Sequence, residues 1–469
     1  MKKVLILSAG TVLFAATFCI PVLFAVLRPF SLTVSQSLLL GVLLQCIVCW
    51  AANLMGRDIV SAYLLLCFFF IGDAKPLQVF NFILTPAVFF SRDVVFFSQN
   101  FIFIISSFLL SAAITKSGLA DRIAKATFMK FAKSPVKVVR FSFVAGTLLI
   151  FLIPQPFPRV IIMSSLYLSL FNKIKINEKM RAVLLFSIFV AATAGCALFI
   201  NGDVILNYAA LGFAGTSLSY AGWIKYMFVP SLILMMLAYF VFNRLYGINN
   251  EAFEFLPEQV DDSKTEISAK LGNNEIKVIA ASVILIVLWL TESLHGIAAA
   301  HAAAIIVIAL FIFRVLDLRD IKVINFSLIL FLTAAFSIGR VLAVNGIAEV
   351  VNAHVFRILP NNQNILYYPL MTIMIMALHF ILGSSITAMS IIIPTLVNLP
   401  HAEPVTMALL AFSVINMQYF LPLHHVIILV GAGKNYYSQK ETIKLGVCFF
   451  LIMVVYIPLV LVQWWRIIL

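Results

Sequence analysis

Residues 153–160 read IPQPFPRV, in which three prolines at alternate positions are followed by Arg159. The stretch lies between two apolar arms, 141–152 and 161–171, in a chain that is 63% hydrophobic. Proline removes a backbone donor and stops a helix, and an arginine at the depth of a bilayer is costly unless it faces a partner or a cavity. The stretch therefore interrupts a helix at the depth of a membrane, where surrounding protein must supply partners for the freed backbone groups.

Composition places the rest of the chain in a membrane as well. Only 11% of the 469 residues are charged and the mean hydropathy is +1.09, with many apolar runs of the about 20 residues that span a bilayer. The formal net charge of +13 comes from loops between these runs, where it sets topology, so no nucleic-acid partner is expected. All six cysteines lie in apolar stretches, which predicts neither disulfides nor a metal site.

The apolar runs predict an all-α polytopic membrane protein with about 11 transmembrane helices and two longer blocks. The blocks, 141–172 and 369–400, are interrupted near their middles by the prolines and by GSSIT at 383–387. Each is either one long tilted helix with a defect or a hairpin that returns to its starting side. The single spans are expected at residues 4–27, 33–55, 58–80, 98–115, 182–206, 223–246, 277–294, 296–315, 323–344, 405–433 and 444–464.

Basic residues decide between these alternatives for the first block. Both flanks are rich in Lys and Arg, so the positive-inside rule places both in the cytoplasm and the block must turn back. The second block lacks such flanks and fits a re-entrant hairpin from outside. We expect a multi-pass protein of the cytoplasmic (inner) membrane, with its N-terminus in the cytoplasm and its C-terminus outside. The flanking residues are Lys116, Arg122, Lys125, Lys130, Lys133, Lys137 and Arg140 before the block, and Lys173, Lys175, Lys179 and Arg181 after it.

An internal repeat extends this symmetry. TKSGLADRIA at 115–124 is similar to AVNGIAEVV at 343–351, and the same offset places Pro156 on Ser384, so that one hairpin tip falls on the other. Helices that look interrupted, at 194–203 and 420–433, occupy matching places. Two copies in opposite orientation form an inverted-repeat transporter plan. The predicted segments are scaffold helices 1–97, a first repeat 98–246, a polar cytoplasmic linker 247–276, scaffold helices 277–322 and a second repeat 323–469.

Two stretches resemble motifs of a known family. SLSYAGWIKYMFVPSLILMMLAYFVFNRLY at 217–246 and FLPLHHVIILVGAGKNYYSQKETIKLG at 420–446 are similar to segments of the divalent anion/sodium symporters (DASS) of the ion transporter superfamily. The resemblance runs from about residue 98 to the end. It implies two inverted repeats, a scaffold and a mobile transport domain, a homodimer, and an elevator movement that carries a small anion.

The chain departs from that family at its ion motifs. Family members carry Ser-Asn-Thr at each hairpin tip, whereas this chain has PQP at 154–156 and SSI at 384–386. The family's Thr-Pro-Pro-Asn in the broken helices is replaced by INGD at 200–203 and LHH at 423–425. Sodium prefers several oxygen ligands, so the changes argue against two symmetric sodium sites. The candidate cation ligands that remain are Gly195, Ser384 and Ser385.

Arg159 and the polar residues of the breaks have alternative roles. The guanidinium fork matches a carboxylate, sulfate or phosphate, or else Arg159 pairs with Asp203 or backbone carbonyls and braces the tip. For His424 and His425, either one of them binds a coupling proton or both brace the helix break by hydrogen bonds. Asn201 and Asp203 either line a cavity or cap a helix. The candidate substrate-binding set is Gln155, Arg159, Asn201, Asp203, Ser384, Ser385, Thr387, His424 and His425.

Three classes of function fit these residues. The first is a symporter or exchanger of a small anion such as a carboxylate or a sulfate-like anion, coupled to Na⁺ or H⁺ or independent of sodium. The others are a membrane enzyme that acts on a lipid-linked substrate and a non-transporting sensor or assembly partner. No recognisable catalytic motif is present, and two costly interruptions favour the carrier. The expected partners are the anion, membrane lipid and a second copy of the chain, with no resident cofactor or metal.

Overall fold

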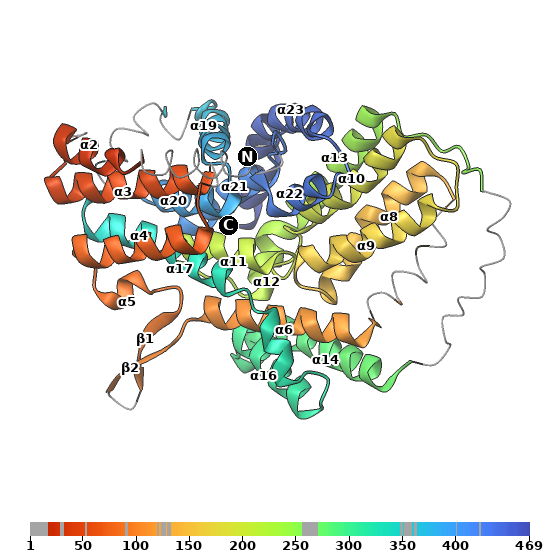
Figure 1. Cartoon of the computed structure of the whole chain (residues 1–469), viewed down its shortest axis with the longest axis horizontal. Coiled ribbons are helices and arrows are strands. Elements are labelled where there is room, and N and C mark those ends of the chain that lie inside the picture. Colours follow the sequence, from red (N-terminus) through yellow and green to blue (C-terminus); the bar gives the residue numbers. More distant parts are fainter. Residues whose placement is uncertain are drawn as a thin grey trace, which may run out of the picture. The chain divides into compact units, whose positions relative to one another are not determined.

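The computed structural model describes residues 17–28, 32–51, 54–89, 92–119, 122, 128, 133–255, 271–347, 350, 359–360, 364–399, 401–421 and 424–469. Helices form nearly all of its regular structure (Figure 1). Contacts divide the chain into two compact units that are each assembled from separate segments. Unit 1 comprises Met1–Phe101, Ala209–Ser217 and Asn325–Ile415, and unit 2 comprises Ile102–Tyr208, Leu218–Ile324 and Asn416–Leu469. The predicted repeat boundaries do not coincide with these units and stay a prediction.

Unit 1 is built mainly of helices from the beginning and the second half of the chain. The helix α17 packs against both α4 and α20, and α3 packs against α2 and α4. Two antiparallel strands, which were not predicted from the sequence, lie between α5 and α6. The elements are α2 (Cys19–Leu27), α3 (Val34–Ala51), α4 (Arg57–Ile71), α5 (Pro76–Val79), β1 (Leu84–Phe89), β2 (Arg92–Phe97), α17 (Phe326–Val344), α19 (Tyr367–Leu382) and α20 (Ser385–Val397).

In unit 2 the helix α10 is central, because it packs against α8, α9, α13 and α22. Its elements are α8 (Pro135–Leu148), η2 (Leu149–Phe151), α9 (Pro156–Phe171), α10 (Glu178–Gly195), α12 (Tyr220–Trp223), η3 (Ile224–Phe228), α13 (Val229–Tyr246), α14 (Asn273–Leu290), α15 (Glu292–His295), α16 (Ala299–Ile312), η5 (Leu318–Val323), α22 (Val426–Gly433), α23 (Gln439–Tyr456), η8 (Ile457–Leu461) and α24 (Val462–Ile468). The chain passes between the units within α6 (Gln99–Ser117), α11 (Val204–Phe213) and α21 (Pro404–Asn416), and also after Ser217 and after Ile324.

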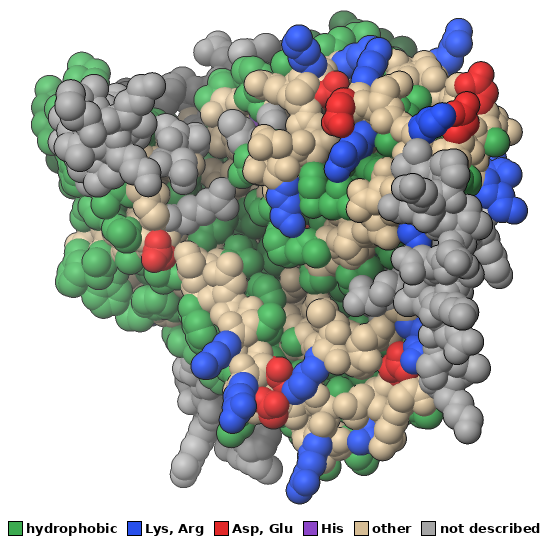
Figure 2. Space-filling view, turned by 45° about the vertical axis from the view of Figure 1, so that its right-hand side comes forward, with side chains coloured by type: hydrophobic (Ala, Val, Ile, Leu, Met, Phe, Trp, Pro, Cys, Tyr) green, Lys and Arg blue, Asp and Glu red, His purple; other side chains and the backbone are tan. Residues whose placement is uncertain are grey.

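Five described helices are long and apolar enough to cross a membrane: Gln99–Ser117, Tyr220–Tyr246, Asn273–Leu290, Phe326–Val344 and Gln439–Ile468. Each coincides with a predicted span, and further helices of 10–17 residues are apolar too. Only 22% of the Asn273–Leu290 window is buried, so most of that apolar helix is free to contact lipid. Hydrophobic side chains also cover much of the left side of the face in Figure 2, where charged side chains are few. The chain is a multi-pass membrane protein.

Both predicted hairpins are present as two helices joined by a short tip. In the first, α8 and η2 lead through 152–155 into α9 (Figure 1). Pro156 and Pro158 are the first and third residues of α9, where a helix has no internal partner for its N–H groups. The prolines therefore start the second arm instead of breaking a helix. In the second hairpin, α19 ends at Leu382 and is capped by Gly383, which has a left-handed φ of 66°.

Both predicted helix interruptions are present as well. The helix α10 ends at Gly195 and α11 begins at Val204, while α21 ends at Asn416 and α22 begins at Val426. A hairpin, a broken helix and a long apolar span thus follow one another twice along the chain. The opposite orientation of the two copies, and the side from which each hairpin enters, stay predictions.

The start of the predicted linker lies along the base of the first hairpin. Phe253 N donates to Lys133 O at 3.0 Å, Lys175 N donates to Glu254 O at 2.9 Å, and Ile174 and Phe255 form an antiparallel bridge. The linker backbone therefore connects the entry of α8 to the exit of α9. Residues 256–270 lie outside the described part of the chain.

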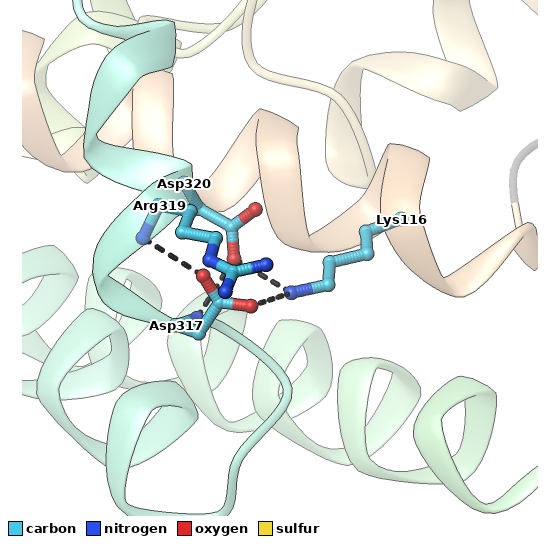
Figure 3. Close-up of polar contacts among 4 residues, drawn as sticks. All are labelled: Lys116, Asp317, Arg319 and Asp320. Carbon is cyan, nitrogen blue, oxygen red and sulfur yellow. Dashed lines mark hydrogen bonds and ion pairs between the residues drawn. The ribbon is translucent and has the colours of Figure 1, made fainter.

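Ion pairs connect the end of α6 to the segment after α16. Lys116 Nζ contacts Asp317 Oδ2 at 3.0 Å and Asp320 Oδ2 at 2.7 Å, while Arg319 N donates to Asp317 Oδ1 at 2.8 Å (Figure 3). The hydrogen bond from the Lys116 ammonium lowers the pKa of Asp317 below its ordinary value. Because these side chains are solvent-exposed, salt screens the interaction and we expect it to orient the helix end more than to stabilise the fold.

We expect Tyr167→Phe to destabilise the first hairpin. The Tyr167 hydroxyl donates to Val138 O at 2.6 Å and lies 2.6 Å from Ser142 Oγ, which in turn lies 2.8 Å from Ser187 Oγ. This buried chain of hydroxyls joins α9, α8 and α10, and losing one member should cost about 1–2 kcal/mol. Thermal unfolding of the purified protein in detergent measures the loss.

Tyr239→Phe is the matched control for this variant. Tyr239 also packs edge-on against a ring of α8, with 5.5 Å between its centroid and that of Phe143. Its hydroxyl makes no hydrogen bond within the described residues, so the melting temperature should stay close to that of the parent protein. Equal losses for the two variants would contradict the importance of the hydroxyl chain.

Candidate functional site

The tip of the first hairpin is attached to the first helix break, and Arg159 is at the centre of this junction. Its side chain lies in the first turn of α9 and is 1% exposed. Nη1 donates to Gly146 O at 3.4 Å, across to the other arm of the hairpin, and Nη2 donates to Gly202 O in the break. Asn201 Nδ2 donates to Ile150 O at 3.2 Å. Arg159 therefore braces the tip through backbone carbonyls.

Side chains from neighbouring helices satisfy the carbonyls that the first break sets free. Trp223 Nε1 donates to Ala197 O at 2.9 Å and Ser231 Oγ donates to the same oxygen at 3.3 Å. The Nδ2 of Asn207, one turn into α11, donates at 3.0–3.1 Å to the carbonyls of Cys196, Phe199 and Ile200. Backbone groups within a membrane need such partners, and these contacts explain how the helix is interrupted at tolerable cost.

Asp203 is the last residue of the break and directly precedes α11. It is 5% exposed, and its Oδ1 accepts a hydrogen bond from Leu206 N at 3.2 Å, which is the geometry of an N-terminal cap. The alternative in which Asp203 forms an ion pair with Arg159 is wrong, because no such pair exists between these two described residues. The Arg159 guanidinium donates to backbone carbonyls instead. The Asp203 carboxylate therefore has no ion-pair partner among the described residues.

The second break lies against the first within unit 2. Asn416, the last residue of α21, donates from Nδ2 to Thr193 O at 2.9 Å and accepts from Cys196 Sγ at 3.5 Å. The hydroxyls of Tyr419 and Thr193 are 2.7 Å apart. The ends of α10 and α21, from the two halves of the sequence, are therefore joined into one polar core beside the two breaks.

Both histidines of the second break make backbone contacts. His425 Nε2 donates to Asn416 O at 2.7 Å, and its ring stacks on Tyr419 with 6.0 Å between centroids. His424 Nδ1 accepts from Leu421 N at 3.3 Å. Both side chains are buried. These contacts across the break are those expected of bracing residues.

The second hairpin tip belongs to unit 1. Ser384 O accepts from Ala388 N at 2.8 Å, which makes Ser384 the N-cap of α20, and Ser385 is buried in the first turn. Thr387 Oγ1 is also buried and has no hydrogen-bond partner among the described residues. The structure thus brings Gln155, Arg159, Gly195, Asn201, Asp203, His424 and His425 into unit 2, and Ser384, Ser385 and Thr387 into unit 1.

Two of the predicted residues have specific packing roles. Gln155 Nε2 donates to Ser107 Oγ on α6 at 3.0 Å, which fixes the tip to that helix. Gly195 ends α10, and a Cβ there would approach Thr147 Oγ1 to 3.3 Å, so the position leaves little space for a side chain.

Two amide side chains that hydrogen-bond at the breaks were not predicted from the sequence. Asn207 is the only charged or amide residue in α11, VILNYAALGF, and Asn416 is the only one in α21, PVTMALLAFSVIN, where it is the last residue. An isolated amide in an apolar helix is costly to bury without partners. That signal was available in the sequence, although the partners themselves were not.

Comparison with known families places the chain in one of them. The chain matches the family described as "Sodium:sulfate symporter transmembrane region" over residues 7–469. The chain belongs to this sodium:sulfate symporter family. The match begins far before residue 98, so membership of the DASS symporters covers the N-terminal helices as well as the segments that carried the resemblance. A search of curated proteins found no match.

For this symporter family member, we expect Gly202→Ala to disrupt the first break. A Cβ at position 202 would collide with the carbonyl oxygen of Cys196 and lie 2.8 Å from its Cα. Because backbone must move to make room, the variant should lose about 1–3 kcal/mol of stability. The loss should appear as a lower melting temperature in detergent.

Gly146→Ala provides the control for that substitution. It also alters a glycine whose carbonyl binds Arg159, but the nearest atom to its new Cβ would be Ala191 Cβ at 4.0 Å. Alanine favours a helix interior over glycine by up to about 1 kcal/mol, so this variant should be neutral or slightly stabilised. If Gly202→Ala melted at the same temperature as the parent protein, the backbone of the first break would have to rearrange at little cost, contrary to this prediction.

Proposed function

We propose that the protein is a secondary transporter, a symporter or exchanger, that moves a small anion across the cytoplasmic membrane. Sulfate and small carboxylates are the anions that fit the proposal. Its family is one of transporters, which supports a role other than catalysis. Two hairpins, two broken helices and the polar core of unit 2 support movement of the anion by an elevator mechanism, in which a mobile part of each subunit of a homodimer carries it across.

A buried positive charge carries this proposal. Arg159 is the only buried Lys or Arg among the described residues. Its Nη atoms bind two carbonyls, while its Nε has no hydrogen-bond partner among those residues. A guanidinium within a membrane requires compensation, and carbonyl dipoles supply only part of it. An anion that reaches this junction would complete the compensation and use the geometry for which arginine is suited.

The positions of basic residues support a proposed orientation of the chain in the membrane. The end of α13 and the start of α23 lie on one side, because Tyr246 Oη donates to Glu441 O at 2.6 Å and Lys444 Nζ donates to Leu245 O at 2.8 Å. Basic residues also flank the base of the first hairpin. We place these ends in the cytoplasm by the positive-inside rule, which leaves the N-terminus in the cytoplasm and the C-terminus outside.

We expect Arg159→Gln to impair anion binding and transport. Losing the positive charge of Arg159 should weaken the binding of sulfate or succinate by about tenfold or more. Purified variant and parent would be reconstituted into proteoliposomes, and uptake of radiolabelled sulfate and succinate measured against an imposed sodium or proton gradient. The result should be near-complete loss of uptake at limiting anion concentration.

Arg181→Gln is the control for this experiment. Arg181 lies near the start of α10, and its guanidinium is 3.8 Å from Glu178 in a partly exposed pair. Uptake by this variant should equal that of the parent. If the parent protein moves neither anion, the transporter proposal fails for this substrate class, and a sensor or a membrane enzyme becomes the better explanation.

A second prediction concerns the coupling ion. Oxygen atoms that could bind sodium are few at the first tip and the first break. The side chain of Gln155 is hydrogen-bonded to Ser107, and carbonyls of the first break already accept hydrogen bonds from Asn207, Trp223 and Ser231. We therefore expect sulfate to raise the melting temperature equally in sodium and in choline buffers, since ligand binding stabilises by mass action. Stabilisation that requires sodium would support a cation site at the second tip, formed with Ser384, Ser385 and Thr387.

A further inference from the structure

We propose that Asp203 binds the proton that is coupled to anion binding. The inference rests on the proposed function, because it assigns a proton site within the same anion-binding junction. It follows from the charges of the buried residues, from the contacts of the Asp203 carboxylate and from those of the two histidines of the second break.

Buried acids are rare among the described residues, and one of them lacks an ion pair there. Among the described residues, Asp203 and Glu275 are the only buried acidic side chains, each 5% exposed. Glu275 Oε1 contacts Arg122 Nε at 2.7 Å and is thus compensated. Asp203 has a backbone N–H as its hydrogen-bond donor and no ion pair within the described chain. A buried carboxylate in such surroundings can remove its charge by binding a proton.

The charged surroundings of Asp203 are simple. Arg159 on α9 and the Cys196 thiol in the same break are the ionisable groups that interact with its carboxylate among the described residues. The tip between α8 and α9 touches this region through Pro154 O, which accepts from Val204 N at 3.5 Å, and adds no titratable group. On the second break, His424 and His425 contact backbone atoms of their own segment.

The charge balance links the proton to the anion. With Asp203 ionised, Arg159 and Asp203 sum to zero and an entering anion would meet a repelling carboxylate. With Asp203 protonated, the junction carries one net positive charge that attracts an anion. A proton from the aqueous phase and the anion therefore favour each other's binding, and reciprocity of the linkage makes them travel together.

The histidines are less suited to this role. Acquiring a proton on His425 would require its other ring nitrogen to become a second donor inside a core where Nε2 already donates to Asn416 O. His424 Nδ1 accepts a hydrogen bond from Leu421 N, and protonation there would place two donors against each other. Protonating Asp203 Oδ2 leaves the hydrogen bond at Oδ1 in place.

The test is the pH dependence of sulfate binding to the full-length protein in detergent, measured by titration calorimetry. Sulfate remains a dianion across the neutral range, so any pH dependence comes from the protein. Affinity of the parent should fall by about tenfold for each pH unit above the point at which Asp203 ionises. Asp203→Asn should bind sulfate at high pH as the parent does at low pH, with its pH dependence lost. Asp203→Glu should retain a pH dependence.

Proton uptake provides a second readout that does not depend on absolute affinity. In weakly buffered solution with a pH indicator, sulfate binding should take up protons in the parent and none in Asp203→Asn. Glu275→Gln, which alters the other buried acid, should behave as the parent does.

Three outcomes would overturn the assignment. Sulfate binding by the parent that is independent of pH, or a pH dependence that survives in Asp203→Asn, would refute the role of Asp203 while leaving the anion transporter intact. Absence of binding to both sulfate and succinate at every pH would reject the proposed function and this inference together.

Discussion

The rest of unit 2 depends on one constraint, which is that backbone groups released by a broken helix must find partners where water is scarce. Asn207 meets much of this need in the first break by donating to three carbonyls. Trp223 and Ser231 satisfy Ala197 O from outside α10 and α11. The break is therefore a bonded structure of defined shape, and it can present side chains such as Asp203 at fixed positions.

The same constraint explains why an arginine occurs at a hairpin tip. Tip and break each leave carbonyls exposed, and a guanidinium has enough donors to bond both at once. Arg159 reaches Gly146 O on one side and Gly202 O on the other. Bracing and anion binding are thus compatible roles, because the two carbonyl bonds orient the fork while its positive charge remains available to a ligand.

The sequence predicted interruptions better than it predicted their partners. Prolines at 154–158 and GSSIT at 383–387 interrupt the apolar blocks locally, so the two interruptions could be placed from the sequence, while the choice of a hairpin for the first block came from its basic flanks. The contact of Asn416 with Thr193 joins positions more than two hundred residues apart, and no local pattern encodes it. The hairpin β1–β2 was missed because TPAVFFSRDVVFF is apolar at positions of both parities, which hides the alternation that marks a strand.

The two hairpin tips differ in a way that bears on coupling. The first has a fixed positive charge and a glutamine held by α6, whereas the second has hydroxyls, of which Thr387 Oγ1 is buried without a hydrogen-bond partner in the described chain. A permanent charge such as Arg159 attracts anions under all conditions and therefore cannot by itself make transport conditional on a second ion. Conditional attraction requires a group whose charge varies, and Asp203 is the carboxylate that interacts with Arg159 among the described residues, so its ionisation would oppose that attraction.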